Sequence, residues 1–178
     1  MAAERGSRPL TIGLVPTAVG GTGMAAWAPG CVLYDNMIRS ALSAAACCTG
    51  AIIGGVLFYQ GETDAVEEGA ASIYPRNLAG FISGVRGELG GGRQLPIVCC
   101  AITGEEHRVP FREVVRRGIL DEAGRTDGVA CIDCAGLELR GDGLHLTASA
   151  QESVGAMLAD ALFPILDQGT LERMKVPS

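Results

Sequence analysis

The sequence has little lysine, no excess of positive charge and no long apolar run, and each absence excludes a class of function. It holds one lysine, Lys175, so it has no Walker loop, in which a lysine follows the glycine-rich turn. The formal net charge is −6, which leaves no basic footprint for nucleic acid or an anionic membrane. No apolar run reaches the roughly 18 residues of a membrane span, and residues 1–10 lack the apolar core of a secretory signal. We therefore expect no nucleic-acid partner and no membrane segment in this chain, while its compartment and oligomeric state stay open.

What the sequence does contain suits one globular domain over residues 1–178. Hydrophobic residues are 48% of the chain and the mean hydropathy is +0.28, enough to build a sizeable core. The seven cysteines are odd in number and two pairs are adjacent within apolar stretches, which favours buried, reduced thiols over a disulfide framework. Cys131 and Cys134 have CxxC spacing, but no second CxxC or CxxH completes a zinc set. We expect no metal and no cofactor.

Apolar runs alternate with helical patterns four times along the chain. The expected strands are 10–16, 51–59, 95–102 and 128–133. The expected helices are 32–46, 74 to about 89 with an earlier start left open, 111–123, and 147 to about 165. Pro75 suits a first helical turn, and Thr147 suits an N-cap. The alternation predicts a three-layer α/β/α fold with a largely parallel sheet, in which ligands bind at the carboxyl ends of the strands.

The glycine-rich turn after the first expected strand does not read as a nucleotide site. A GxGxxA frame passes through Gly21, Gly23 and Ala26, but that fingerprint requires a helix to begin at the turn. Pro29 and Gly30 would stop such a helix within about two turns. The glycines therefore need another explanation.

The segment GDGLHLT, residues 141–147, carries the first candidate chemistry. Asp142 precedes His145 by three positions in a glycine-rich loop, so both side chains can turn toward one cleft. A carboxylate that fixes the imidazole tautomer leaves the other ring nitrogen free to act as a base. The plainer interpretation is an aspartate that caps the following helix. His107, the only other histidine, is expected in a surface loop.

The segment QGETDA, residues 60–65, places polar side chains at the end of a strongly apolar strand. The amide of Gln60 could donate a hydrogen bond to a developing oxyanion, and a glycine N–H from residues 20–22 could point into the same pocket. The alternative is a helix-start device in which Thr63 or Asp64 is the N-cap.

The segments IGLVPTAVGGT, FYQGETDA and DGLHLT, with Trp27 after the first, resemble one family in their order and spacing. They are similar to the plant-type carbohydrate esterases of the sialate O-acetylesterase-like group, in the SGNH (GDSL-like) hydrolase superfamily. The resemblance covers about residues 12–166 and implies a flavodoxin-like fold and a serine esterase that removes acetyl groups from carbohydrate or another small ester. It implies that His145 is the general base and Asp142 the carboxylate that orients it.

The same resemblance assigns roles to residues at the two other strand ends. Gly20 or Gly21 and the amide of Gln60 would line the oxyanion hole. Gly61 and Glu62 would complete the substrate-binding surface, with Glu62 shaping its floor rather than acting as an acid.

The sequence departs from the family upstream of these motifs. The family's nucleophile is a serine in a Gly-Gln-Ser-Asn motif after a first strand, and this sequence has neither; Ser7 is the only serine before residue 10. That strand lies inside the family's sheet, so we expect unpaired backbone groups and an apolar gap in its place. The resemblance thus implies an N-terminally truncated member: an incomplete gene model, a splice product or a decayed copy. Three hypotheses stay open, namely an esterase of doubtful activity, a non-catalytic carbohydrate-binding or regulatory remnant, and a hydrolase that uses a cysteine.

Overall fold

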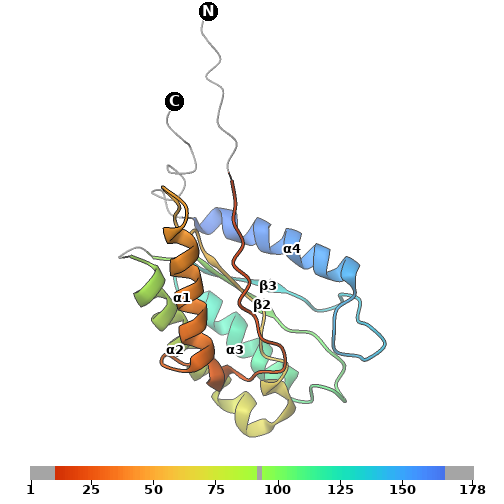
Figure 1. The fold of residues 1–178 in the computed structure, drawn as a ribbon. Helices are drawn as coiled ribbons and strands as arrows, with labels where there is room; N and C mark the ends of the chain where they lie inside the picture. Colours follow the sequence, from red (N-terminus) through yellow and green to blue (C-terminus); the bar gives the residue numbers. More distant parts are fainter. Residues whose placement is uncertain (1–10, 92–93, 167–178) are drawn as a thin grey trace, which may run out of the picture.

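The computed structural model describes residues 11–91 and 94–166, in which helices cover both faces of a parallel sheet (Figure 1). The strands lie in the order β1 (Val56–Phe58), β2 (Ile97–Ala101) and β3 (Val129–Asp133), and both pairings are parallel. The α-helices of the described part are α1 (Val32–Ala46), α2 (Glu68–Leu89), α3 (Arg112–Arg125) and α4 (Ala148–Leu162). The fold is therefore the three-layer α/β/α arrangement that the alternating pattern predicted.

The central strand β2 separates two apolar clusters. All five of its residues are buried, as expected for a parallel strand covered on both faces. Ile97 and Cys99 belong to the larger cluster, which includes buried side chains of α1, α2 and α3. Val98 and Cys100 belong to the smaller cluster, which α4 covers. Alternate residues of β2 thus point to opposite layers.

Two helices begin as the sequence predicted. The structure gives α1 the bounds 32–46, which are those expected from its apolar periodicity. α4 begins at Ala148, directly after Thr147, whose hydroxyl accepts a hydrogen bond from the Ala150 N–H at 3.3 Å. α4 ends at Leu162 and is followed by the 3₁₀ turn Phe163–Ile165, so together they nearly fill the predicted range.

The interpretation of Pro75 as a first-turn residue is wrong. α2 begins at Glu68, the earlier start that the sequence left open, and Pro75 therefore lies inside the helix rather than in its first turn. The buried side chains of Ala71 and Tyr74 show why the helix extends this far, since its apolar face begins before the proline. The Pro75 ring faces α3 at Gly118, where an added Cβ would lie 2.7 Å from the proline Cγ. The missing side chain of Gly118 lets the two helices approach closely.

The expected strand over 10–16 is not formed in its described residues, and β1 is shorter than the expected 51–59. Residues 11–19 are assigned to no helix or strand; they run between α1 and α4 (Figure 1). Leu10 lies outside the described residues. The side chains of Ile12 and Leu14 are 67% and 80% exposed. An extended segment becomes a strand only with a hydrogen-bonded neighbour, and the described residues offer none here.

The thiols are divided between core and surface. All seven cysteines are free; Cys99, Cys100 and Cys134 are buried, as predicted. Cys47 and Cys48 are exposed, contrary to the expectation for an apolar stretch, because they follow the last residue of α1 rather than lying on its buried face. No described helix combines the length and apolar character needed to cross a membrane.

Candidate active site

The Asp142–His145 pair forms as the sequence predicted. His145 Nδ1 lies 2.7 Å from Asp142 Oδ2. Asp142 Oδ1 also accepts hydrogen bonds from the backbone N–H groups of Leu144 and His145, each at 2.9 Å. These bonds, first that from the His145 N–H, then that from its ring and that from the Leu144 N–H, hold the pKa of Asp142 well below its ordinary range. Asp142 is therefore an ionised acceptor that fixes the orientation of the imidazole.

The loop that carries this pair is a short hairpin beyond the carboxyl end of β3. Leu139 and Leu146 form an antiparallel bridge, and the Arg140 N–H donates to the His145 carbonyl at 2.7 Å. Gly143 has φ +68°, a conformation that glycine adopts without strain. The Glu105 N–H, in the loop after β2, donates to the Gly143 carbonyl at 2.8 Å. The hairpin is thus tied to the neighbouring strand end, and the His145 side chain stays 67% exposed.

Gln60 follows β1 and is nearly buried. Its Nε2 donates to the Thr22 carbonyl at 3.1 Å and to Asp64 Oδ2 at 2.6 Å. Both partners are acceptors, so the amide cannot be turned around without placing its oxygen against a carboxylate. Gln60 Oε1 is buried and has no hydrogen-bond partner among the described residues. Both amide hydrogens are therefore used inside the protein in this arrangement, and donation to an oxyanion stays a prediction.

Asp64 joins two segments that are far apart in the sequence. Its two oxygens accept from the backbone N–H of Met24 at 3.0 and 2.9 Å, and Met24 begins the 3₁₀ helix η1 (Met24–Trp27). The Trp27 indole N–H donates to the Thr22 hydroxyl at 3.0 Å, which in turn donates to the Val19 carbonyl. The interpretation of Thr63 or Asp64 as an N-cap is wrong: Thr63 precedes the 3₁₀ helix η2 (Asp64–Val66) without a capping hydrogen bond from its side chain, and Asp64 instead binds Met24. Sequence spacing gave no signal for a partner 40 positions away.

Gly61 and Glu62 complete the carboxyl end of β1. Gly61 has φ +137°, and a Cβ there would lie 2.8 Å from Val115 Cγ1, so no other residue fits without displacement. Burial raises the pKa of Glu62, and the nearby charge of His145 acts in the opposite direction. The role of Glu62 in shaping the floor of the site remains a prediction.

Gly20 and Gly21 lie in an exposed turn before η1. Gly21 has φ +71°, and an added Cβ at either glycine would meet nothing within 4 Å. No hydrogen bond among the described residues joins this turn to His145, although Gln60 ties Thr22 to the end of β1. The oxyanion role of these glycines is therefore still a prediction. Ser7 lies outside the described residues.

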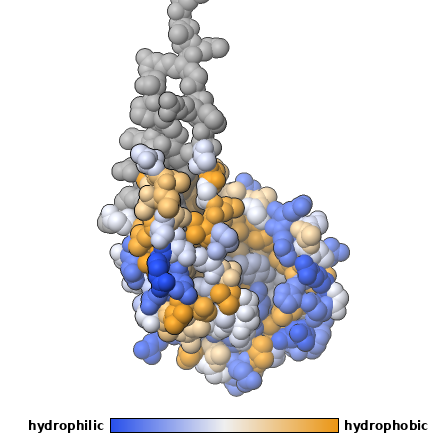
Figure 2. Space-filling model, in the orientation of Figure 1, coloured by the Kyte–Doolittle hydropathy of each residue, from blue (hydrophilic) through white to orange (hydrophobic). Residues whose placement is uncertain are grey.

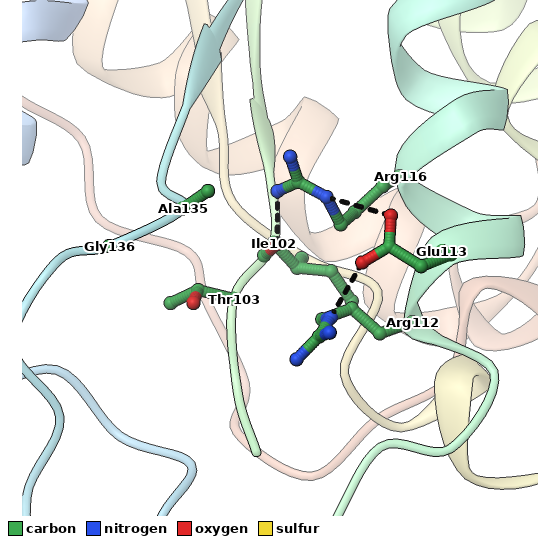
Figure 3. A pocket seen from close by; sticks show the side chains of 7 residues that line it. All are labelled: Ile102, Thr103, Arg112, Glu113, Arg116, Ala135 and Gly136. Atoms are coloured by element: carbon green, nitrogen blue, oxygen red, sulfur yellow. Dashed lines mark hydrogen bonds and ion pairs between the residues drawn. The ribbon is translucent and has the colours of Figure 1, made fainter. Parts of the chain in front are cut away.

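A cavity of about 220 Å³ lies at the carboxyl ends of β2 and β3 (Figure 3). Arg116, from α3, is one of its lining residues, and its guanidinium donates to the Ile102 carbonyl at 2.7 Å and to both oxygens of Asp133 at 2.8 and 2.9 Å. Burial opposes ionisation of Asp133, but hydrogen bonds from the Ala135 N–H and Arg116 outweigh it and lower the Asp133 pKa. Sequence analysis did not identify Arg116, because only the fold brings it to these strand ends.

The thiols of the sheet are poor nucleophiles. Burial raises the pKa of Cys99 to about 12 and that of Cys131 to about 11, so both stay protonated at neutral pH. Cys100 is buried beside Cys134, and their mutual hydrogen bond, followed by burial, raises the pKa of Cys100 further. The raised pKa values of Cys99, Cys100 and Cys131 do not support the hypothesis of a hydrolase that uses one of these three cysteines, whereas the hydrogen bond with Cys100 lowers the pKa of the buried Cys134.

A parallel α/β/α fold with a histidine–carboxylate pair beyond its last strand is an arrangement that occurs among hydrolases. The profile of the family described as carbohydrate esterase, sialic acid-specific acetylesterase matches residues 1–164. A probable carbohydrate esterase from Arabidopsis thaliana is 35% identical over 150 residues. The crystal structure of that protein is similar with a TM-score of 0.75 and 33% identity, over 83% of this chain. The chain belongs to this carbohydrate esterase family.

The match is uneven in length. It covers 84% of this chain but 55% of the Arabidopsis protein, and 59% of the chain in the crystal structure. The chain thus spans little more than half of the curated relative.

Proposed function

We propose that this chain carries the acid–base part of an esterase site for acetylated carbohydrate or another small acetyl ester. The observation that carries the proposal is the Asp142–His145 pair, with 2.7 Å between Asp142 Oδ2 and His145 Nδ1. Membership of the carbohydrate esterase family supports the choice of an ester as substrate.

The chemistry follows from the acceptor beside the imidazole. The ionised Asp142 can only accept a hydrogen bond, so the proton of the neutral imidazole stays on Nδ1. The lone pair that can act as a base is therefore on Nε2. In ester hydrolysis that nitrogen takes the proton of the attacking hydroxyl group or water and later returns it to the leaving alcohol. Asp142 stabilises the imidazolium that exists between these two transfers. The exposed position of His145 leaves its ring accessible to such a substrate.

The test is hydrolysis of p-nitrophenyl acetate and of an acetylated sugar by the purified chain and its variants. His145→Ala should remove most of the activity, and Asp142→Asn should reduce it by about 10²-fold or more, because the imidazole loses its tautomer-fixing partner. His107→Ala is the matched control, since His107 is an exposed histidine 3.2 Å from a carboxylate of Glu105. It corrects for hydrolysis by any surface imidazole.

The result separates the hypotheses. If the parent hydrolyses the acetyl ester and only the His145 and Asp142 variants lose the activity, the proposal holds. Equal rates for the parent, His145→Ala and His107→Ala would contradict it.

A further inference from the structure

One peptide group in the loop after β2 is held at both of its polar ends. Its carbonyl, that of Gly104, accepts a hydrogen bond from Arg112 Nη1 of α3. Its N–H, that of Glu105, donates to the Gly143 carbonyl of the hairpin at 2.8 Å. Because a trans peptide group is planar, its C=O and N–H point in opposite directions, and a donor that fixes the carbonyl also fixes where the N–H points.

A second peptide group continues the same line into the hairpin. The Gly143 carbonyl shares its peptide group with the Leu144 N–H, which donates to Asp142 Oδ1 at 2.9 Å. Asp142 Oδ2 in turn lies 2.7 Å from His145 Nδ1. Four hydrogen bonds therefore form an unbroken chain from the Arg112 guanidinium to the imidazole.

The first peptide group of this chain lies in a tightly packed place. Gly104 is buried, and a Cβ added there would lie 2.7 Å from Val109 Cγ2. Among the described residues, Arg112 is the only one that donates to the Gly104 carbonyl. Removing this donor would leave a buried carbonyl without a partner, which is costly. The orientation of the peptide group therefore depends on Arg112.

Arg112 is itself held in position by Glu113 (Figure 3). Glu113 Oε1 accepts from Arg112 Nε at 2.9 Å, and Glu113 Oε2 lies 3.5 Å from Arg116 Nε. Arg116 donates to the Ile102 carbonyl, two residues before Gly104. The first two turns of α3 thus fix the backbone that follows β2 at two carbonyls, and only 29% of the Arg112 side chain is exposed.

The chain of bonds connects this packed backbone with the surface. Gly104 is buried, whereas Asp142 and His145 are exposed. In Figure 2 hydrophilic residues gather on the right-hand side of the molecule, where Figure 1 places the loop between β3 and α4. Exposed ion pairs lose side-chain freedom when they hold one geometry, and water screens their attraction. A connection to fixed backbone is therefore what an exposed catalytic pair requires.

We propose that Arg112 is a positioning residue for the Asp142–His145 pair and acts on it through the peptide groups 104–105 and 143–144. The proposal rests on the proposed function, in which this pair transfers the proton. Each hydrogen bond in a chain polarises the next one, so a cationic donor at the first bond strengthens the N–H that reaches Asp142. Arg112 thereby supports the carboxylate without touching it.

NMR of the substrate-free protein tests the proposal without a measurement of hydrolysis. Arg112→Met keeps a long apolar side chain but has no donor. The amide protons of Glu105 and Leu144 should move upfield and exchange faster with solvent, because both of their hydrogen bonds weaken. Arg112→Lys keeps a cationic donor and should leave both signals close to those of the parent. Arg117→Met is the matched control: it removes the same charge from an exposed position of α3 and should move neither signal.

Two further measurements follow the effect to His145. The ring ¹⁵N shifts of His145 report the share of the tautomer that carries its proton on Nδ1, and this share should fall in Arg112→Met. With p-nitrophenyl acetate, Arg112→Met should lower kcat by about threefold to tenfold and leave KM nearly constant, because Arg112 acts through the histidine. Arg112→Lys should recover most of the loss.

The Leu144 amide separates the possible results. If it stays at the parent position in Arg112→Met while the Glu105 amide moves, the chain ends at the first peptide group and the proposal is overturned. Equal shifts in Arg112→Met and Arg117→Met would overturn it as well, as would an unchanged tautomer of His145. A parent without esterase activity would contradict the proposed function alone, since the amide and imidazole signals still test the role of Arg112.

Discussion

Gln60 Nε2 lies 2.6 Å from Asp64 Oδ2, and this bond links two polar residues of the segment that follows β1. Asp64 receives the Met24 N–H as well, and Gln60 donates to the Thr22 carbonyl. The polar residues at the end of β1 therefore hold the glycine-rich turn in place. Both donors, the Met24 N–H and the Gln60 amide, use the buried carboxylate of Asp64 as their acceptor. The positions of Gln60 and of the glycine-rich turn therefore depend on Asp64.

Replacing Asp64 should destabilise the protein. Asp64→Ala leaves the buried Met24 N–H and one hydrogen of Gln60 without acceptors, so the free energy of unfolding should fall by about 2–4 kcal/mol. Urea denaturation of the parent and the variant measures the difference. Asp160→Ala, at an exposed position of α4, is the control and should change stability little. A loss equal to that control would mean that these bonds contribute nothing.

Gly61 should tolerate no side chain. Gly61→Ala combines a positive φ with a contact of 2.8 Å to Val115 Cγ1, and we expect a loss of about 2–4 kcal/mol. Gly20→Ala, where a Cβ would meet nothing within 4 Å, should cost less than about 1 kcal/mol. The comparison is made by thermal or urea denaturation. If both variants were equally stable, the close approach at Gly61 would not exist in solution.

Arg116 should support the ends of β2 and β3. Arg116→Ala removes the donor to the Ile102 carbonyl and leaves Asp133 without its guanidinium partner, which should cost about 2–3 kcal/mol. The neighbouring Arg117 is exposed, so Arg117→Ala removes the same charge without these bonds and should be nearly neutral. Denaturation curves at two salt concentrations separate the two effects. Equal losses would point to net charge rather than to the hydrogen bonds.

The low pKa of Asp142 can be measured directly. Carboxyl ¹³C NMR should place its titration below the ordinary value of 3.8. His145→Ala should raise the midpoint only in part, because the backbone N–H groups of residues 144 and 145 remain. Asp142 binds its proton more weakly in the folded state than in the unfolded state. Its contribution to the free energy of unfolding is therefore present above the unfolded-state pKa and is lost as the pH falls through the folded-state pKa. A midpoint at or above 3.8 in the parent would contradict the arrangement.

The sequence predicted best those features that depend on residues close together in the chain. Apolar periodicity gave α1 its bounds, Thr147 marked the start of α4, and the spacing of Asp142 and His145 predicted a pair that the structure forms. It failed at Pro75, where a local rule for the first turn competed with an apolar face that starts earlier. It also failed at residues 10–16, where composition favours a strand but a strand requires a neighbour.

The sequence by itself determined the alternation of helices and apolar strands, the family, and the short-range pair Asp142–His145, because each depends on residues within a few positions of one another. The tertiary structure alone decided which distant groups meet: Asp64 with Met24, Arg116 with Asp133, and Gly61 with Val115. It also decided that residues 11–18 make no backbone–backbone hydrogen bond with the rest of the described chain. Contacts between distant segments depend on how the sheet and helices are assembled, and no spacing within one segment contains that information.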